Sequence, residues 1–436
     1  MKQSEFKKRR LALMQQVGQG NIALIASASN QTRNRDVEFP FRQDSDFYYL
    51  TGFNESDALA VFIPGREQGE YILFCQEFDE KKALWEGAHA GLEGATRHYD
   101  ADDSFPISDM DDILPGMLEN KAKVFYPMGR DGELDHQILE WITHLRKQSR
   151  NGTNAPGELV SLEHILHEMR LIKSAAELKL MRIAADVSCK AHARAMQKCK
   201  PGLYEYQIEA EVVHEFMNNG LRYVAYPSIV AGGKNACVLH YVDNKDKLKR
   251  GDLLLIDAGV ECDHYASDIT RTFPVSGRFS PAQRQLYQLV LDAQYASIEQ
   301  IKPGLSWNKA HEASVEVLTT GLVELGLLKG RVSKLIKDEK YKQFYMHKIG
   351  HWLGMDVHDV GDYKLDNEWR LLEPGMVLTI EPGLYIPLDY KKVDAKWRGI
   401  GIRIEDDILV TKTGYEVLTK ALPKEIDEIE NLMQAK

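Results

Sequence analysis

The sequence predicts an α/β protein of two domains, and three observations carry that prediction. A chain of 436 residues is long enough for two or three domains. In its N-terminal part, short apolar runs alternate with helix-like stretches, which is typical of α/β domains. In its C-terminal half, several strand-like runs end in a carboxylate. We therefore expect one domain over residues 1–170 and a second over residues 171–436.

Four apolar runs predict the strands of the first domain. They lie at residues 22–26, 59–63, 71–75 and 123–126, and their β-branched and aromatic residues favour strands. Upstream of them, the basic run at residues 7–10 is expected to form the solvated face of a first helix. Only four apolar residues follow this run, too few for the core of a signal peptide.

The domain boundary is predicted near a polar stretch at residues 149–157, whose Gly, Pro, Asn and Ser residues are typical of a loop. Farther along, Ser174 and Glu177 have the spacing of a capping box that opens a long helix. The second domain is expected to begin at this helix or one helix earlier.

Two aspartates mark the first strand pair of the second domain. Residues 252–260 predict a buried strand that contains Asp257, and residues 267–275 predict a second strand that contains Asp268. The aspartates are eleven residues apart, which would place them on opposite faces of one continuous strand. A hairpin between them would allow both side chains to face the same site.

Three histidines, His347, His351 and His358, recur at spacings of four and seven residues. On a helix these spacings share one face. Gly350 and Gly354 make an irregular or extended path equally compatible with the sequence.

Two glutamates complete the acidic set. Glu381 follows an apolar run and precedes a Pro-Gly turn. Glu405 lies within the apolar run at residues 399–410, where strict alternation places Arg403 and Glu405 on the same face.

Taken singly, an acidic residue at a strand end is more often a cap or turn former, and a lone histidine more often a hydrogen-bonding partner. Four carboxylates in apolar strands argue instead for shared cations, because burying an uncompensated charge is costly. Oxygen donors with one nitrogen and no sulfur favour Mn²⁺, Co²⁺, Zn²⁺ or Mg²⁺. The predicted ligands are Asp257, Asp268, His351, Glu381 and Glu405.

These motifs resemble the pita-bread metallopeptidases, the family of aminopeptidase P, prolidase and methionine aminopeptidase. The residues that carry the resemblance are 257–259, 268–271, 351–354, 357–359, 381–385 and 403–406. Residues 41–53 resemble the N-terminal domain of aminopeptidase P in particular. The resemblance implies a creatinase/prolidase-like α/β domain over residues 1–170, serving oligomerisation and substrate access. It implies a pseudo-symmetric pita-bread catalytic domain over residues 171–436.

The resemblance also implies a role for each ligand of two divalent metal ions, with Mn²⁺ the first candidate. Asp257 would chelate one metal, Asp268 and Glu405 would bridge both, and His351 with Glu381 would complete the other. Glu381 would also act as the general base toward a metal-bridging hydroxide.

Further roles follow from the same resemblance. His240 and His358 would contact the substrate near the scissile bond and take part in catalysis, and His347 would line a proline pocket. Arg403 would pair with a ligand carboxylate and hold it in place. Packing without direct catalysis is the alternative for all three histidines.

Two aromatic residues are expected at the substrate. Tyr385 is a candidate contact, and Trp85 resembles a tryptophan that reaches the site of a neighbouring subunit. The latter implies a homo-oligomer, a dimer or a tetramer. An ordinary surface or core tryptophan is the alternative for Trp85.

The resemblance implies an aminopeptidase that hydrolyses the N-terminal Xaa-Pro bond and releases one amino acid. One alternative is prolidase, which cleaves only dipeptides and whose relatives also attack phosphotriesters. A non-catalytic binding module with the same fold is a second alternative, although such a module would be expected to lack some of the ligands.

Composition limits the kinds of partner that the protein is expected to bind and the cellular compartment in which it is expected. The net charge of −10 argues against broad nucleic-acid binding. No apolar run is long enough to cross a membrane. Five cysteines with no CxxC motif are best explained as reduced thiols, which favours the cytoplasm.

Overall fold

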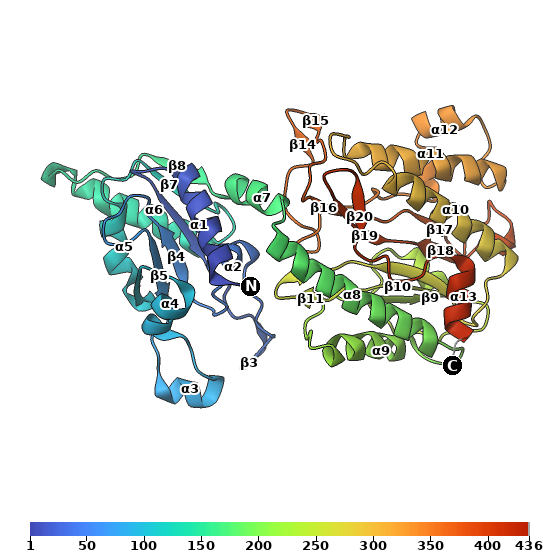
Figure 1. Ribbon diagram of the computed structural model, residues 1–436, viewed down its shortest axis with the longest axis horizontal. Helices are drawn as coiled ribbons and strands as arrows, with labels where there is room; N and C mark the ends of the chain where they lie inside the picture. Colours follow the sequence, from blue (N-terminus) through green and yellow to red (C-terminus); the bar gives the residue numbers. More distant parts are fainter. Residues whose placement is uncertain (435–436) are drawn as a thin grey trace. The chain divides into compact units, whose positions relative to one another are not determined.

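The computed structural model describes residues 1–434 (Figure 1). The chain forms two compact units, Met1–Met169 and Arg170–Lys436. The boundary falls within helix α7 (Glu163–Leu171), after the polar stretch that the sequence marks as a loop.

The N-terminal unit is built on a mixed sheet of six strands in the order β6-β5-β4-β1-β7-β8. The strands are β1 (Ile22–Ala26), β4 (Leu59–Phe62), β5 (Tyr71–Cys75), β6 (Asp103–Pro106), β7 (Lys123–Tyr126) and β8 (Glu158–Ser161). Strand β1 pairs with β7 in parallel and with β4 in antiparallel fashion. All four strands predicted for this domain are present, and β4 ends one residue earlier than expected.

The helices that precede α7 in this unit are α1 (Gln3–Val17), α2 (Ser45–Thr51), α3 (Glu80–Glu86), α4 (Gly91–Tyr99), α5 (Met110–Leu118) and α6 (Gly132–Lys147). Helix α3 projects away from the sheet (Figure 1). A small hairpin, β2 (Thr32–Asn34) and β3 (Val37–Glu38), precedes α2. The core packs Leu and Ile side chains of α5 and α6 against the strands.

The expectation for the basic run was wrong in one respect. The first helix is present, but Arg9 and Arg10 are buried rather than solvated, with 6% and 3% of their surface exposed. Each guanidinium donates to a carbonyl at the end of α2, Arg9 to Tyr49 and Arg10 to Leu50. The guanidinium of Arg9 also stacks 4.0 Å above the Tyr49 ring, so an aromatic surface and carbonyl acceptors replace water.

The second unit begins with a helix pair. Ser174 accepts from the backbone of Glu177 and Glu177 from that of Ser174, so the predicted capping box opens α8 (Ala175–Lys198). Helix α9 (Glu205–Asn218) packs against α8. Strands β9 (Ile229–Gly232), β10 (Leu253–Asp257) and β13 (Thr270–Pro274) follow, with β10 in the centre and both neighbours antiparallel.

The same order recurs in the second half of this unit. A helix pair, α10 (Pro281–Ile298) and α11 (Asn308–Glu324), is followed by antiparallel strands. Those strands are β16 (Val377–Ile380), β17 (Gly383–Ile386), β18 (Ile400–Arg403), β19 (Asp406–Val410) and β20 (Tyr415–Val417). Strand β16 pairs with β19, and β17 pairs with β18. The chain thus repeats one helix-then-strand plan, as expected for a pseudo-symmetric domain.

Minor elements complete the second unit. They are the hairpins β11 (Glu261–Cys262) with β12 (Tyr265–Ala266) and β14 (Lys364–Leu365) with β15 (Glu368–Trp369), and the helices α12 (Val332–Lys337) and α13 (Ile426–Gln434). Apolar side chains of α8, α9, α10 and the central strands form one buried core. This core fixes the strand ends from which the acidic side chains project.

Candidate functional site

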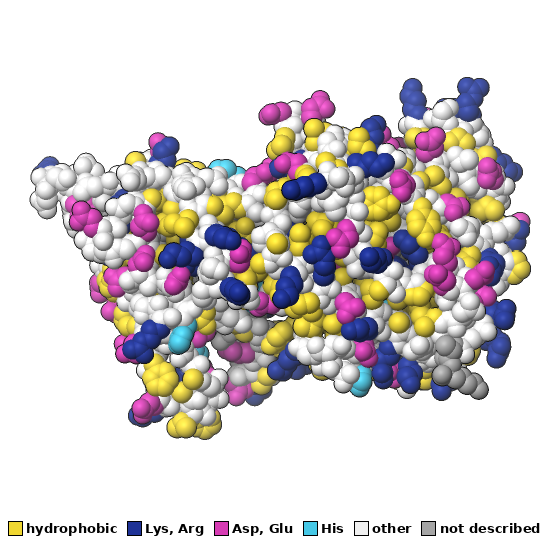
Figure 2. Space-filling view, viewed as in Figure 1, with side chains coloured by type: hydrophobic (Ala, Val, Ile, Leu, Met, Phe, Trp, Pro, Cys, Tyr) yellow, Lys and Arg dark blue, Asp and Glu magenta, His cyan; other side chains and the backbone are white. Residues whose placement is uncertain are grey.

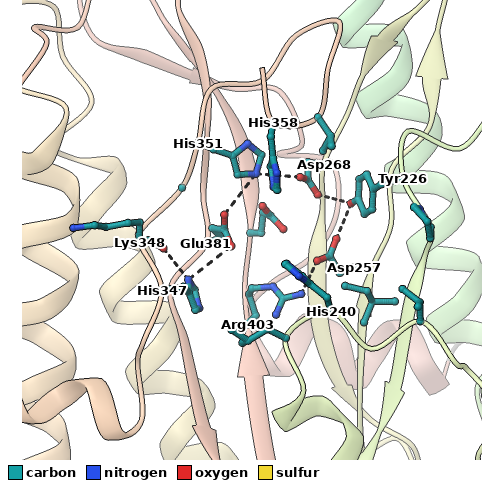
Figure 3. A pocket seen from close by; sticks show the side chains of 17 residues that line it. Tyr226, His240, Asp257, Asp268, His347, Lys348, His351, His358, Glu381 and Arg403 are labelled. Carbon is teal, nitrogen blue, oxygen red and sulfur yellow. Dashed lines mark hydrogen bonds and ion pairs between the residues drawn. The ribbon is translucent and has the colours of Figure 1, made fainter. Parts of the chain in front are cut away.

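A cavity of about 390 Å³ opens among the strands of the second unit (Figure 3). All five predicted metal ligands line it, together with three predicted histidines and Arg403. The lining residues are Tyr226, Pro227, Ile229, Leu239, His240, Val242, Asp257, Asp268, His347, Lys348, Gly350, His351, Val357, His358, Glu381, Arg403 and Glu405.

The two aspartates reach the cavity from one antiparallel strand pair. Asp257 is the last residue of β10, and Asp268 lies two residues before β13. The register pairs Asp257 with Thr270, and the hairpin of β11 and β12 lies between the strands. The predicted hairpin therefore exists, and both carboxylates face one cavity.

His351 lies on an irregular segment, so the helical alternative for the three histidines was wrong. Its backbone pairs with Thr379 of β16: His351 N donates to Thr379 Oγ1 at 3.1 Å, and Thr379 N donates to His351 O at 2.9 Å. A Cβ on Gly350 would lie 1.9 Å from Thr379 O. Only glycine permits this approach of the two backbones, which brings the imidazole to the cavity.

The glutamates come from strand ends as well. Glu381 follows β16 directly, and Glu405 occupies the break between β18 and β19. The apolar run at residues 399–410 is therefore two strands rather than one. The Thr270 hydroxyl donates to Glu405 Oε2 at 2.6 Å, and Arg271 Nη1 donates to Glu405 O at 2.6 Å, so both ends of this residue are held.

The donor atoms converge closely enough to share a cation. One ligand atom each of Asp268, His351 and Glu405 lies within 4.8 Å of the others. His351 Nε2 is 3.4 Å from Asp268 Oδ2 and 3.6 Å from Glu381 Oε1. This oxygen-rich set with a single imidazole is suited to a divalent metal ion.

The protein alone leaves the site short of positive charge. Burial and the neighbouring carboxylates raise the pKa values of Asp268, Glu381 and Glu405. Burial by itself would lower the pKa of His351, but Asp268 and Glu381 raise it to about 9. Raised pKa values on clustered buried carboxylates indicate that the site lacks compensating positive charge, which bound cations would supply, so the residues fit a metal centre.

Arg403 lines the cavity and contacts three side chains around it. Its Nη2 is 2.5 Å from Asp257 Oδ2, and its Nε donates to Thr270 Oγ1 at 3.0 Å. A third contact, from Nη1 to the Tyr385 hydroxyl at 3.1 Å, connects it to His347, whose Nε2 is 2.9 Å from the same hydroxyl. Tyr385 is fully buried behind the cavity and does not line it.

His358 and His240 also line the cavity, and both are exposed. The rings of His358 and His351 are 4.3 Å apart and nearly perpendicular. Burial lowers the pKa of His358 and, more strongly, lowers that of His347 to about 4. Both rings are thus neutral near pH 7 and can donate and accept at the same time.

Trp85, like Tyr385, is a predicted site residue that does not line this cavity. It lies on α3 of the N-terminal unit, with 89% of its surface exposed.

Sequence reasoning missed three side chains that hold the acidic ligands. The Tyr226 hydroxyl contacts both Asp257 and Asp268. Thr270 supports Glu405, and the buried carboxylate of Asp407 accepts from Asp268 N at 3.2 Å. Tyr226 stands in an irregular segment without periodicity, so no local signal marked it. The acidic pair at positions 406 and 407 beside Glu405 was the one visible hint.

Known proteins with similar sequences agree with this geometry. Residues 179–412 match metallopeptidase family M24, and residues 6–126 match the N-terminal domain of aminopeptidase P. The chain is 44% identical to the Xaa-Pro aminopeptidase of Escherichia coli, a similarity that covers 99% of this chain and 98% of that protein. It is 43% identical to the Xaa-Pro aminopeptidase of Haemophilus influenzae, covering 98% and 97%.

Solved structures show the same likeness. The aminopeptidase PepP of Pseudomonas aeruginosa superposes with a TM-score of 0.98 at 56% identity, covering 99% of this chain and 98% of that one. Escherichia coli aminopeptidase P with the inhibitor Pro-Leu superposes with a TM-score of 0.96 at 44% identity, with the same coverage. The predicted fold, an N-terminal α/β domain followed by a pita-bread catalytic domain, is confirmed. Because these matches span both domains, the chain belongs to metallopeptidase family M24 and, within it, to the enzymes of the aminopeptidase P type.

Proposed function

We propose that this enzyme releases the N-terminal residue from peptides whose second residue is proline, using two divalent metal ions. The observation that carries the proposal is the meeting of four carboxylates and one imidazole in a single cavity that also presents His240 and His358. The relatives named Xaa-Pro aminopeptidase support the choice of substrate.

The residues that would hold the metals are Asp257, Asp268, His351, Glu381 and Glu405. Their hard donors suit Mn²⁺, Co²⁺, Zn²⁺ or Mg²⁺, and Mn²⁺ is our first candidate. A zinc-substituted structure of Escherichia coli aminopeptidase P in complex with product is known. Two bound ions would lower the pKa of a water and polarise the scissile carbonyl.

Protein groups around this centre would perform the proton transfer, the substrate binding and the orientation of the ligands. Glu381, whose burial raises its pKa, is suited to accept a proton from the attacking water and return it to the departing proline nitrogen. His358, neutral near pH 7, would donate a hydrogen bond to the substrate carbonyl, and His240 would hold the peptide from the other side. Arg403 would keep Asp257 oriented through their contact.

The composition of the cavity lining supports proline at the second position. Its apolar residues include Pro227, Ile229, Leu239, Val242 and Val357. These side chains and His347 would face the pyrrolidine ring. A tertiary amide has no N–H, so no buried acceptor is needed there.

We further propose that the enzyme is a dimer or tetramer in the cytoplasm. Leu84 and Trp85 of α3 are 86% and 89% exposed in the N-terminal unit, and Figure 2 shows apolar side chains gathered there. Such apolar exposure is unusual for a side chain without a partner. Among residues 1–434, no helix combines the length and apolarity needed to cross a bilayer.

The test compares three peptides on metal-stripped protein refilled with Mn²⁺: Xaa-Pro, Xaa-Pro-Xaa-Xaa and Xaa-Ala-Xaa-Xaa. Release of one residue from the longer proline peptide establishes the proposed activity. Cleavage of the dipeptide alone makes the enzyme a prolidase. If none of the three peptides is cleaved, the proposal is contradicted and a binding module of the same fold is favoured.

A further inference from the structure

A buried ion cluster lies outside the cavity and has no part in the mechanism above. The carboxylate of Asp359 is held between two cations: Arg170 Nη2 is 2.6 Å from its Oδ1, and Lys173 Nζ is 2.9 Å from its Oδ2. All three side chains are at most 2% exposed. Arg170 also contacts the partly exposed Asp356 at 2.8 Å.

The loop at residues 351–359 is folded around this carboxylate. Asp359 N donates to Trp352 O at 2.9 Å, which closes the loop, and Asp356 N donates to Asp359 Oδ1 at 3.4 Å. A Cβ on Gly354 would lie 2.1 Å from Asp359 Oδ2, so the backbone passes against the carboxylate where only glycine fits. The two ends of this loop carry the histidines that face the cavity.

The cations themselves belong to a rigid part of the second unit. Lys173 N donates to Gly375 O at 2.9 Å, and the next residue, Ser174, caps the 24-residue helix α8. Burial would raise the pKa of Asp359, but Lys173 and Arg170 keep it below its ordinary range. The carboxylate is therefore charged and anchored to the start of a long helix.

Stability alone is a poor explanation for such a cluster. Removing charged groups from water costs about as much as their attraction returns, so a buried ion pair adds little net stability. A buried ion pair can instead favour one conformation of the chain, because any displacement leaves a buried charge without its partner.

We propose that Asp359, clamped by Arg170 and Lys173, is a positioning residue that fixes His358 against the cavity. The two residues are adjacent in the chain, so a shift of Asp359 moves the His358 backbone directly. The His358 ring lies 4.3 Å from the ring of the proposed metal ligand His351, so a displaced His358 would leave its place beside the metal centre. This inference rests on the proposed function, in which His358 contacts the substrate.

The first test is Lys173→Met, which removes one cation from the clamp and keeps an unbranched side chain. We expect kcat to fall about 10- to 100-fold, as for other residues that orient catalytic groups. The matched control is Arg194→Met in the same unit, which removes a guanidinium that lies 2.7 Å from Glu211 and 3.7 Å from Glu215. The control is expected to keep the wild-type kcat, and an equal loss in both variants would overturn the proposal.

A double-mutant cycle separates positioning from general support. If the clamp acts through His358, Lys173→Met has no further effect on kcat in a His358→Ala background. The same fold-loss in both backgrounds would overturn the proposal. Should Lys173→Met not fold, Asp359→Asn, which keeps the shape of the side chain, supplies the same comparison.

A readout independent of peptide hydrolysis completes the test. The imidazole NMR signal of His358 is expected to shift in the Lys173→Met protein relative to the wild type and to the Arg194→Met control. An unchanged His358 signal overturns the positioning role. A wild-type enzyme that cleaves no Xaa-Pro peptide overturns the proposed function instead, and the NMR comparison still decides the role of the clamp.

Discussion

The hydroxyl of Tyr226 donates a hydrogen bond to Asp257, with 2.7 Å between Oη and Oδ1. The same hydroxyl contacts Asp268 Oδ1. Burial and the two carboxylates raise the pKa of Tyr226, so the hydroxyl keeps its proton. One proton can serve only one carboxylate at a time. Bound cations would neutralise both carboxylates, including the one that receives no hydrogen bond from the tyrosine. The position of Tyr226 between the two carboxylates therefore fits a metal centre.

The first prediction concerns that hydroxyl. Tyr226→Phe should leave the fold unchanged, because it removes one oxygen atom and no apolar contact. We expect metal affinity to fall about tenfold, since two ligand carboxylates lose the group that orients them. Calorimetric titration of the metal-stripped protein with Mn²⁺ measures this loss. Affinity equal to the wild type would show that the metals alone orient the carboxylates.

Asp268→Ala provides a more severe test of the metal centre. Asp268 is buried between His351 and the Tyr226 hydroxyl, and it is one of the residues that would hold the metals. The variant should lose activity and retained metal together, as measured by peptide hydrolysis and by metal analysis after gel filtration. Full activity in this variant would refute the two-metal proposal.

His358→Ala should separate turnover from metal binding. The His358 ring faces the cavity but contributes no atom to the cluster formed by Asp268, His351 and Glu405. We expect kcat to fall by about 10²-fold or more, the range for loss of a group that acts only in the transition state, while the metal content stays at the wild-type level. If the variant loses metal instead, His358 is a ligand and its assigned role is wrong.

The strand ends were the predictable part of this site. Asp257 and Glu381 close apolar runs, and buried strands that end in a charge are visible in a single sequence. Tyr226 was not predictable, because the irregular segment that carries it has no periodicity and its partners lie 31 and 42 residues away. The break at Glu405 was missed because apolar residues alternate up to Ile404 and resume at Ile408, so residues 399–410 are compatible with one continuous strand.

Charge patterns were less informative than apolar patterns. A basic run is ordinarily solvated, yet Arg9 and Arg10 are buried because Tyr49, Tyr71 and the carbonyls of α2 replace their water. These acceptors are some 40 residues distant in the chain, so only the tertiary structure reveals them.

The histidine and carboxylates of the cavity set the pH dependence of the metal-free enzyme. The folded state raises the pKa of His351 to about 9, above its ordinary value of about 6.5. A group with a raised pKa stabilises the fold fully below the unfolded value and loses that contribution as pH rises through the folded value. Glu381 and Glu405, also raised, act with the same sign.

We therefore expect the free energy of unfolding of the metal-free protein to fall between pH 7 and 9. The buried His192 and His311 and the half-buried His347 have pKa values lowered to about 4 and oppose this trend only below about pH 6.5. Urea denaturation in the presence of a chelator measures the decline. Saturating Mn²⁺ should abolish or reverse it, because the ligands bind metal in their deprotonated forms and affinity rises with pH. A metal-free protein whose stability is constant or increases from pH 7 to 9 would contradict the charge deficit inferred for the site.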